Sequence, residues 1–159
     1  MNSTDLSTVM MDKLAEAAWA QLAGMSPRAL HIGEIAAIAG IAPSAARAVS
    51  GSITALILHQ LARFDRQAIL ESLADIEDAG EVPVRDKIME ALMHRFEVYA
   101  PYRAQMIQLE AAARRDPVLG LRLVESLLQA TRMLLRMAGD DLAGFRGEAR
   151  VRGVAGLAI

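Results

Sequence analysis

The sequence predicts an all-helical protein, from its composition and from the spacing of its apolar residues. Of the 159 residues, 53% are apolar but only 4% are aromatic, and Ala, Leu, Met and Arg together far outnumber Val, Thr and Tyr. The first group favours helices and the second favours strands. Apolar residues also recur three and four positions apart, as on one face of a helix. This length and apolar content suit about one globular domain and exclude a disordered or collagen-like chain.

The first predicted helix covers residues 5–23. Its apolar residues share one helical face, and they are Leu6, Val9, Met10, Leu14, Ala17, Ala18 and Leu22. Gly24 and Pro27 follow, and these two residue types commonly end a helix and begin a loop. We therefore expect a loop between this helix and the next one.

The next two predicted helices are short and meet at a glycine turn. The first covers residues 32–39 and stops at Gly40, and the second begins at Pro43, where a missing amide N–H costs nothing. Ala36 is small enough for the two helices to approach, and Gly40 tolerates a positive φ. The apolar residues that would pack the pair are Ile35, Ile41, Ala46 and Val49. These features are those of a helix-turn-helix unit.

A long helix is predicted over residues 52–78, with Ser52 as its N-terminal cap. Pro83 begins another helix, and Pro101 restarts the chain for a further one. Asp116 and Pro117 together combine a capping side chain with a residue suited to the first helical turn. They predict a helix that continues to residue 138.

The last predicted helix covers residues 142–159 and finishes in the apolar run of residues 154–159. A helix with such an end needs a partner for its apolar stripe and its last carbonyl groups. We expect either packing against a second protomer or a following element.

The charge and the residue types exclude several classes of protein. The longest stretch without Lys, Arg, Asp or Glu is residues 48–62, which is too short to span a bilayer, and no basic region of a secretory signal precedes Lys13. The absence of cysteine excludes disulfides and a cysteine nucleophile and is compatible with the cytoplasm. No phosphate-binding glycine loop or nucleophile motif is present, so we expect neither an enzyme nor a cofactor.

Net charge offers little attraction for nucleic acid. The whole chain carries −2, and the first 75 residues have more acidic than basic side chains. The basic ones are Lys13, Arg28, Arg47, Arg63 and Arg66, and the acidic ones are Asp5, Asp12, Glu16, Glu34, Asp65, Glu71 and Asp75.

The histidines give no metal-binding pattern. His31, His59 and His94 lie on or beside separate predicted helices, without a second histidine four residues away or a neighbouring cysteine. We therefore expect no metal site. His94, with Arg95 and Glu97, could line the polar end of a pocket.

The order of elements resembles the TetR family of bacterial regulators, and the most specific stretch is HIGEIAAIAGIA at residues 31–42. The resemblance implies a DNA-binding helix-turn-helix region over residues 1–51. It also implies a bundle over residues 52–159 that binds a small apolar ligand and forms a homodimer. We expect the bundle to lack the usual last helix of the family.

By this resemblance, the protein is a transcriptional regulator whose partner is double-stranded DNA. The family commonly has a Ser-Lys-Gly-Thr-Leu-Tyr-x-His-Phe run where residues 42–50 here read APSAARAVS. The family's Thr, Tyr and His correspond to Ala45, Arg47 and Val49, and its following Lys corresponds to Ile53. The candidate DNA-binding residues are Arg28, Ser44, Ala45, Arg47 and Ser52.

A second resemblance, over residues 84–117 and 150–153, is to bacterial relatives of the ubiquinone-biosynthesis lipid-binding protein. These relatives keep a TetR-like fold without binding DNA, so the alternative function is binding of an isoprenoid or another lipid. Flexible methionines suit an adaptable apolar pocket. The candidate ligand-binding residues are Met89, Met93, Phe96, Leu127 and Met133.

Overall fold

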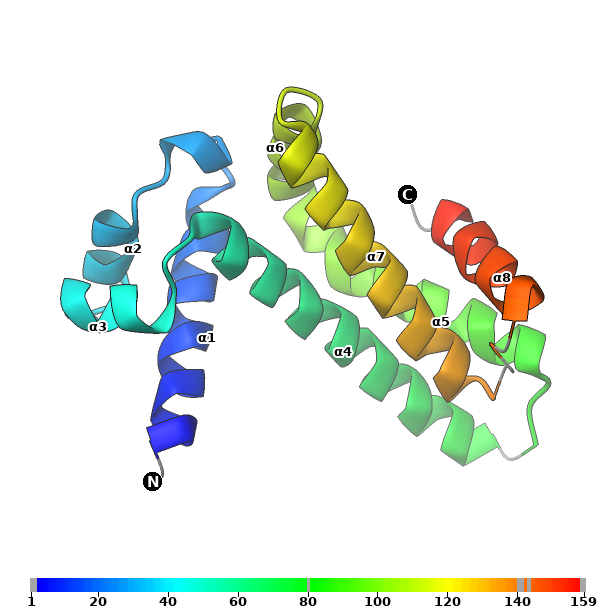
Figure 1. Ribbon diagram of the computed structural model, residues 1–159. Helices are drawn as coiled ribbons and strands as arrows, with labels where there is room; N and C mark the ends of the chain where they lie inside the picture. The colour runs from blue at the N-terminus through cyan, green and yellow to red at the C-terminus, as the bar shows by residue number, and fades with distance from the viewer. Residues whose placement is uncertain (1–2, 80, 140–141, 143, 158–159) are drawn as a thin grey trace. The chain divides into compact units, whose positions relative to one another are not determined.

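The computed structural model describes residues 3–79, 81–139, 142 and 144–157, and the regular structure in these ranges is entirely helical (Figure 1). This confirms the all-helical prediction. The α-helices are α1 (Ser3–Gln21), α2 (Ile32–Ile38), α3 (Pro43–Val49), α4 (Ile53–Ala79), α5 (Val84–Tyr99), α6 (Arg103–Ala113), α7 (Pro117–Met137) and α8 (Gly144–Leu157). Two 3₁₀ turns that the sequence pattern does not predict are η1 (Pro27–Ala29) and η2 (Ala100–Tyr102).

The chain divides into two compact units. Unit 1 contains residues 1–61 and 102–122, and unit 2 contains residues 62–101 and 123–159. Both α4 and α7 therefore contribute one end to each unit. The predicted boundary at residue 51, between a DNA-binding region and a ligand-binding bundle, stays a prediction.

Unit 1 is built around α1, against which α2 and α3 pack (Figure 1). The face of α1 that the sequence predicts is buried at Leu14, Ala18 and Leu22. Trp19, on the same helix, is buried and meets the ring of Tyr102 edge-on, with 5.8 Å between ring centroids. This aromatic contact joins α1 to the second segment of unit 1.

The turn between α2 and α3 has the predicted helix-turn-helix geometry. The two helix axes differ in direction by 112°, within the range usual for this motif. Gly40 has a φ of 67°, and the amide groups of Gly40 and Ile41 donate to the carbonyl oxygens of Ala37 and Ala36. This is the hydrogen-bond pattern of a Schellman motif, in which glycine adopts the left-handed conformation at low cost.

Two predicted helix caps are present. The hydroxyl oxygen of Ser52 accepts a hydrogen bond from the Ala55 amide at the start of α4. The Asp116 carboxylate accepts hydrogen bonds from the amides of Val118 and Leu119 at the start of α7. Each side chain thus satisfies amide groups that have no partner within the first turn.

In unit 2, α5, α7 and α8 share an apolar core. Its buried members are Ala91, Leu92, Leu134, Leu135 and Val151. The predicted terminal helix therefore buries one face within this unit, at Val151 and Ala155, while Leu157 is exposed. Residues 158–159 of the predicted apolar run lie outside the described residues.

None of the described helices alone has the length and apolar content of a membrane span. The two short helices α2 and α3 reach that composition only when they are taken together across their 112° bend.

Replacement of Gly40 tests the turn. Gly40→Ala should lower the free energy of unfolding by about 1–2 kcal/mol, because alanine is disfavoured at positive φ. A new Cβ atom meets nothing within 4 Å, so steric contact would not contribute. The measurement is the urea midpoint of circular dichroism.

Gly33→Ala is the matched control, since Gly33 lies within α2 and also has open space for a Cβ atom. This change should raise stability by about 0.5 kcal/mol, because alanine is the better helix former. Equal midpoint shifts in the two variants would contradict the role assigned to Gly40.

Candidate functional site

The exposed surface of α3 carries part of the predicted DNA-binding set. Ser44 and Arg47 are both exposed and lie three residues apart, on one face of the helix. Ala46, between them, is fully buried and anchors α3 in unit 1. Ala45 is half-buried and offers no polar side-chain atom. One cation and one hydroxyl group therefore face outward from this helix.

The other two polar residues of the predicted DNA-binding set, Arg28 and Ser52, already have partners. Arg28, in η1, is exposed, and its guanidinium lies 3.4 Å from a carboxylate oxygen of Asp116. Amide hydrogen bonds from Leu119 and Val118, together with Arg28, lower the pKa of Asp116. The Ser52 side chain caps α4. Only Ser44 and Arg47 are thus placed together on one exposed helical face.

The predicted ligand-binding residues lie on two helices of unit 2, and none of them lines the cavity described below. Met89, Met93 and Phe96 follow one another along a single face of α5, and each is about half exposed. Met133 is exposed on α7, and Leu127 on the same helix is half-buried. Their role in ligand binding stays a prediction.

A small cavity in unit 2 has a different lining. Its volume is about 10 Å³, close to the space that one water molecule occupies. Asp65 and Arg95 give it a charged wall, and Thr131 adds a hydroxyl group. The other lining residues are Ala68, Ile69, Ala91, Leu92, Ala130 and Leu134. The cavity therefore has both polar and apolar lining residues and is too small for an organic ligand.

The charged wall of this cavity is a compact network. Arg95 donates from Nε to Asp65 Oδ1 at 2.9 Å, and the Tyr99 hydroxyl donates to the same oxygen at 3.1 Å. The Arg95 guanidinium also lies over the Tyr99 ring, 4.7 Å from its centroid. Asp65 is only 4% exposed. A buried carboxylate is thus paired with both a cation and a hydroxyl donor.

Burial dominates the titration of this network. Loss of hydration raises the pKa of Asp65 above its ordinary value, although Arg95 and Tyr99 act in the opposite direction. Burial and the neighbouring carboxylate also raise the pKa of the Tyr99 phenol. Tyr99 therefore stays a neutral hydrogen-bond donor throughout the physiological pH range.

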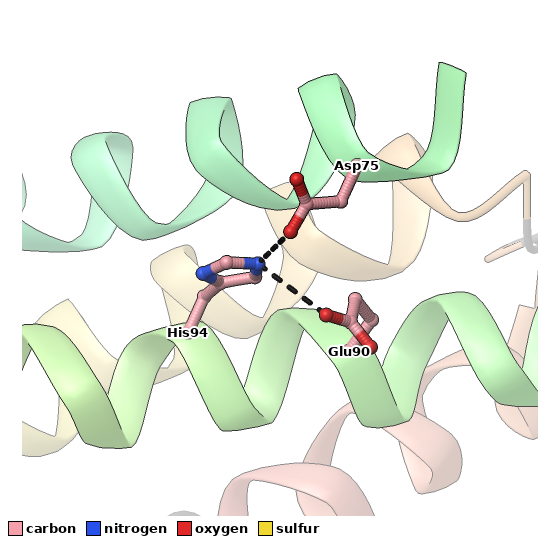
Figure 2. Close-up of side chains that lie close together, drawn as sticks. All are labelled: Asp75, Glu90 and His94. Atoms are coloured by element: carbon pink, nitrogen blue, oxygen red, sulfur yellow. Dashed lines mark hydrogen bonds and ion pairs between the residues drawn. The ribbon is translucent and has the colours of Figure 1, made fainter. Parts of the chain in front are cut away.

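A second polar cluster in unit 2 surrounds His94 on α5 (Figure 2). Its Nε2 atom lies 2.8 Å from an oxygen of Asp75 on α4 and 3.4 Å from an oxygen of Glu90 on α5. Its Nδ1 atom lies 3.8 Å from Glu71 and 3.7 Å from Glu97. Both ring nitrogens consequently face carboxylates from two helices.

The sequence contains a partial signal for each network. Asp65 falls among the apolar positions Leu61, Phe64 and Ala68 of one helical face, which marks it as a buried charge in need of a partner. Glu90 and His94 have the four-residue spacing of neighbours on a helix. The spacing of histidines and cysteines does not reveal the carboxylate of Asp75, which reaches His94 from another helix. Of the three residues expected at the polar end of a pocket, His94, Arg95 and Glu97, Arg95 lines the cavity described above.

Comparison with known proteins identifies no relative: no protein-family model, no curated protein and no solved structure matches this chain. The sites above are therefore interpreted from their own geometry.

Removal of one charge should test the Asp65 network. Asp65→Asn keeps the side-chain volume but removes the negative charge that pairs with the Arg95 guanidinium. Loss of one member of a buried ion pair should lower the free energy of unfolding by about 3 kcal/mol, measured by chemical denaturation. Glu81→Gln, a change of an exposed carboxylate in the same unit, should have almost no effect.

The double variant Asp65→Asn, Arg95→Met should recover most of that loss, because neither member of the charge pair is then buried alone. If the double variant loses the sum of the two single effects, the two residues are not coupled.

Proposed function

We propose that the protein is a DNA-binding transcriptional regulator in which α3 contacts duplex DNA. The observation that carries this proposal is the 112° arrangement of α2 and α3 around the left-handed turn at Gly40. In helix-turn-helix proteins the second helix of such a pair enters the major groove. Here that helix has its buried side at Ala46 and its exposed side at Ser44 and Arg47.

The exposed face of α3 offers two side chains, those of Arg47 and Ser44, that can form hydrogen bonds with DNA. An arginine binds a phosphate or the O6 and N7 atoms of guanine, and a serine hydroxyl binds a phosphate or a base edge. Glu34, exposed on α2, adds a negative charge to the same pair of helices, which does not favour binding to DNA. We therefore expect weak non-specific binding that decreases with salt.

The effector of the regulator is proposed to be a small apolar molecule, and the active form a homodimer. Support for an apolar effector comes from the half-exposed face of Met89, Met93 and Phe96, because exposed apolar side chains at helical spacing attract apolar partners. The lipid-binding alternative shares this face. It has no separate support, since the cavity described in unit 2 holds about one water molecule.

Binding to random-sequence duplex DNA tests the proposal directly. Fluorescence anisotropy at low and at physiological salt should show an affinity that falls steeply as salt is added. Arg47→Ala should weaken binding about tenfold and reduce the salt slope by about one counterion, because one cationic contact is lost.

Arg85→Ala is the control, since Arg85 is also an exposed arginine on a helix but lies on α5 and belongs to unit 2. Its affinity should equal that of the unmodified protein. Absence of binding at low salt would overturn the proposed function, and equal losses in the two variants would remove α3 from the interface.

A further inference from the structure

The His94 cluster has more negative charge than its single imidazole can balance. Asp75 and Glu90 approach one ring nitrogen, and Glu71 and Glu97 approach the other. Even a protonated imidazole would leave the group with three net negative charges. Within the described part of the chain, no lysine or arginine forms an ion pair with any of these carboxylates. A cation would therefore relieve their mutual repulsion.

The spacing of the donor atoms fits a metal ion. Bonds of about 2.1 Å at tetrahedral or octahedral angles separate neighbouring ligand atoms by about 3.0–3.4 Å. The distances from His94 Nε2 to Asp75 and Glu90 are 2.8 and 3.4 Å, and the donor atoms of all three side chains lie within 4.8 Å of one another (Figure 2). Only small side-chain movements are needed to admit an ion.

The backbone holds these ligands in place. Glu90 and His94 are one turn apart on α5, and Asp75 projects toward them from α4, as Figure 2 shows. The His94 side chain is only 15% exposed, whereas those of Asp75 and Glu90 are 58% and 48% exposed. The imidazole is thus restrained by its surroundings, while the carboxylates leave a path from solvent.

The other ring nitrogen is placed to support coordination. A proton on Nδ1 would point toward the carboxylates of Glu71 and Glu97, which lie beyond hydrogen-bond distance but within ion-pair range. In the hydrogen bond with Asp75, Nε2 donates its proton to the carboxylate oxygen. A metal on Nε2 would displace that proton to solvent and leave the ring proton on Nδ1, facing Glu71 and Glu97.

We propose that Asp75, Glu90 and His94 bind a divalent transition-metal cation through one imidazole nitrogen and two carboxylate oxygens, with water in the remaining positions. The nitrogen ligand favours Zn²⁺, Co²⁺ or Mn²⁺ over Mg²⁺, which prefers an all-oxygen environment. The proposal does not depend on DNA binding.

Calorimetric titration with Zn²⁺ near neutral pH tests the site in the full chain. One ion should bind per chain, and Mg²⁺ should bind at least tenfold more weakly. Asp75→Asn and Glu90→Gln should each weaken Zn²⁺ binding at least tenfold, and His94→Gln should weaken it further. His31→Gln and Glu81→Gln are the controls, since both residues are exposed and lie outside the cluster.

A second measurement needs no variant. The chain has three histidines, so its ring proton resonances form a small and separable set. Substoichiometric Mn²⁺ should broaden the resonance that disappears in His94→Gln before it affects those of His31 and His59. Equal broadening of all three, or Zn²⁺ binding that the cluster variants do not change, would overturn the proposed site.

Discussion

Close approach of helices at alanine is the constraint on which both units depend. Ala15 and Ala18 on α1 are fully buried, as are Ala36 and Ala46 on the two helices that pack against α1. In unit 2, buried alanines occupy α4, α5, α7 and α8, at Ala68, Ala91, Ala130 and Ala155. A methyl side chain lets two helix backbones come near each other, and larger apolar residues then fill the space on either side. A larger residue at these positions would force the helices apart.

Such close packing determines which polar groups are buried with partners and which are left near solvent. Asp65 is buried between small residues, so it requires both the Arg95 guanidinium and the Tyr99 hydroxyl as partners. The carboxylates around His94 retain contact with water and can therefore remain an unbalanced acidic group. The same α4–α5 pair thus supports a closed structural network and an open cluster that is suited to a cation.

The helix-turn-helix unit separates the requirements of fold from those of function. Gly40, Ala36 and Ala46 satisfy the backbone and packing requirements of the motif. The exposed face of α3, however, contributes only one cation and one hydroxyl group. A fold of this kind does not specify DNA binding by itself, because affinity for the duplex comes from phosphate and base contacts. The exposed side chains, and not the backbone fold, determine how many such contacts can form.

The sequence by itself determined the helices and their ends. Proline, glycine and capping residues act on the nearest backbone groups. The start of α3 at Pro43 and the starts of α4 and α7 directly after the capping residues Ser52 and Asp116 therefore follow from local chemistry. The left-handed turn at Gly40 is local in the same sense. The two 3₁₀ turns were not predicted, because short turns have no apolar period of their own.

Only the tertiary structure decided which side chains meet. The pairs Asp65 with Arg95 and Asp75 with His94 join α4 to α5 and depend on the register of two packed helices, which helical periodicity does not encode. Met89, Met93 and Phe96 have the spacing of a core face, yet they are half exposed because α5 buries Ala91 and Leu92 instead. Periodicity shows that a helix has an apolar face, whereas the neighbouring helices determine which apolar residues are covered.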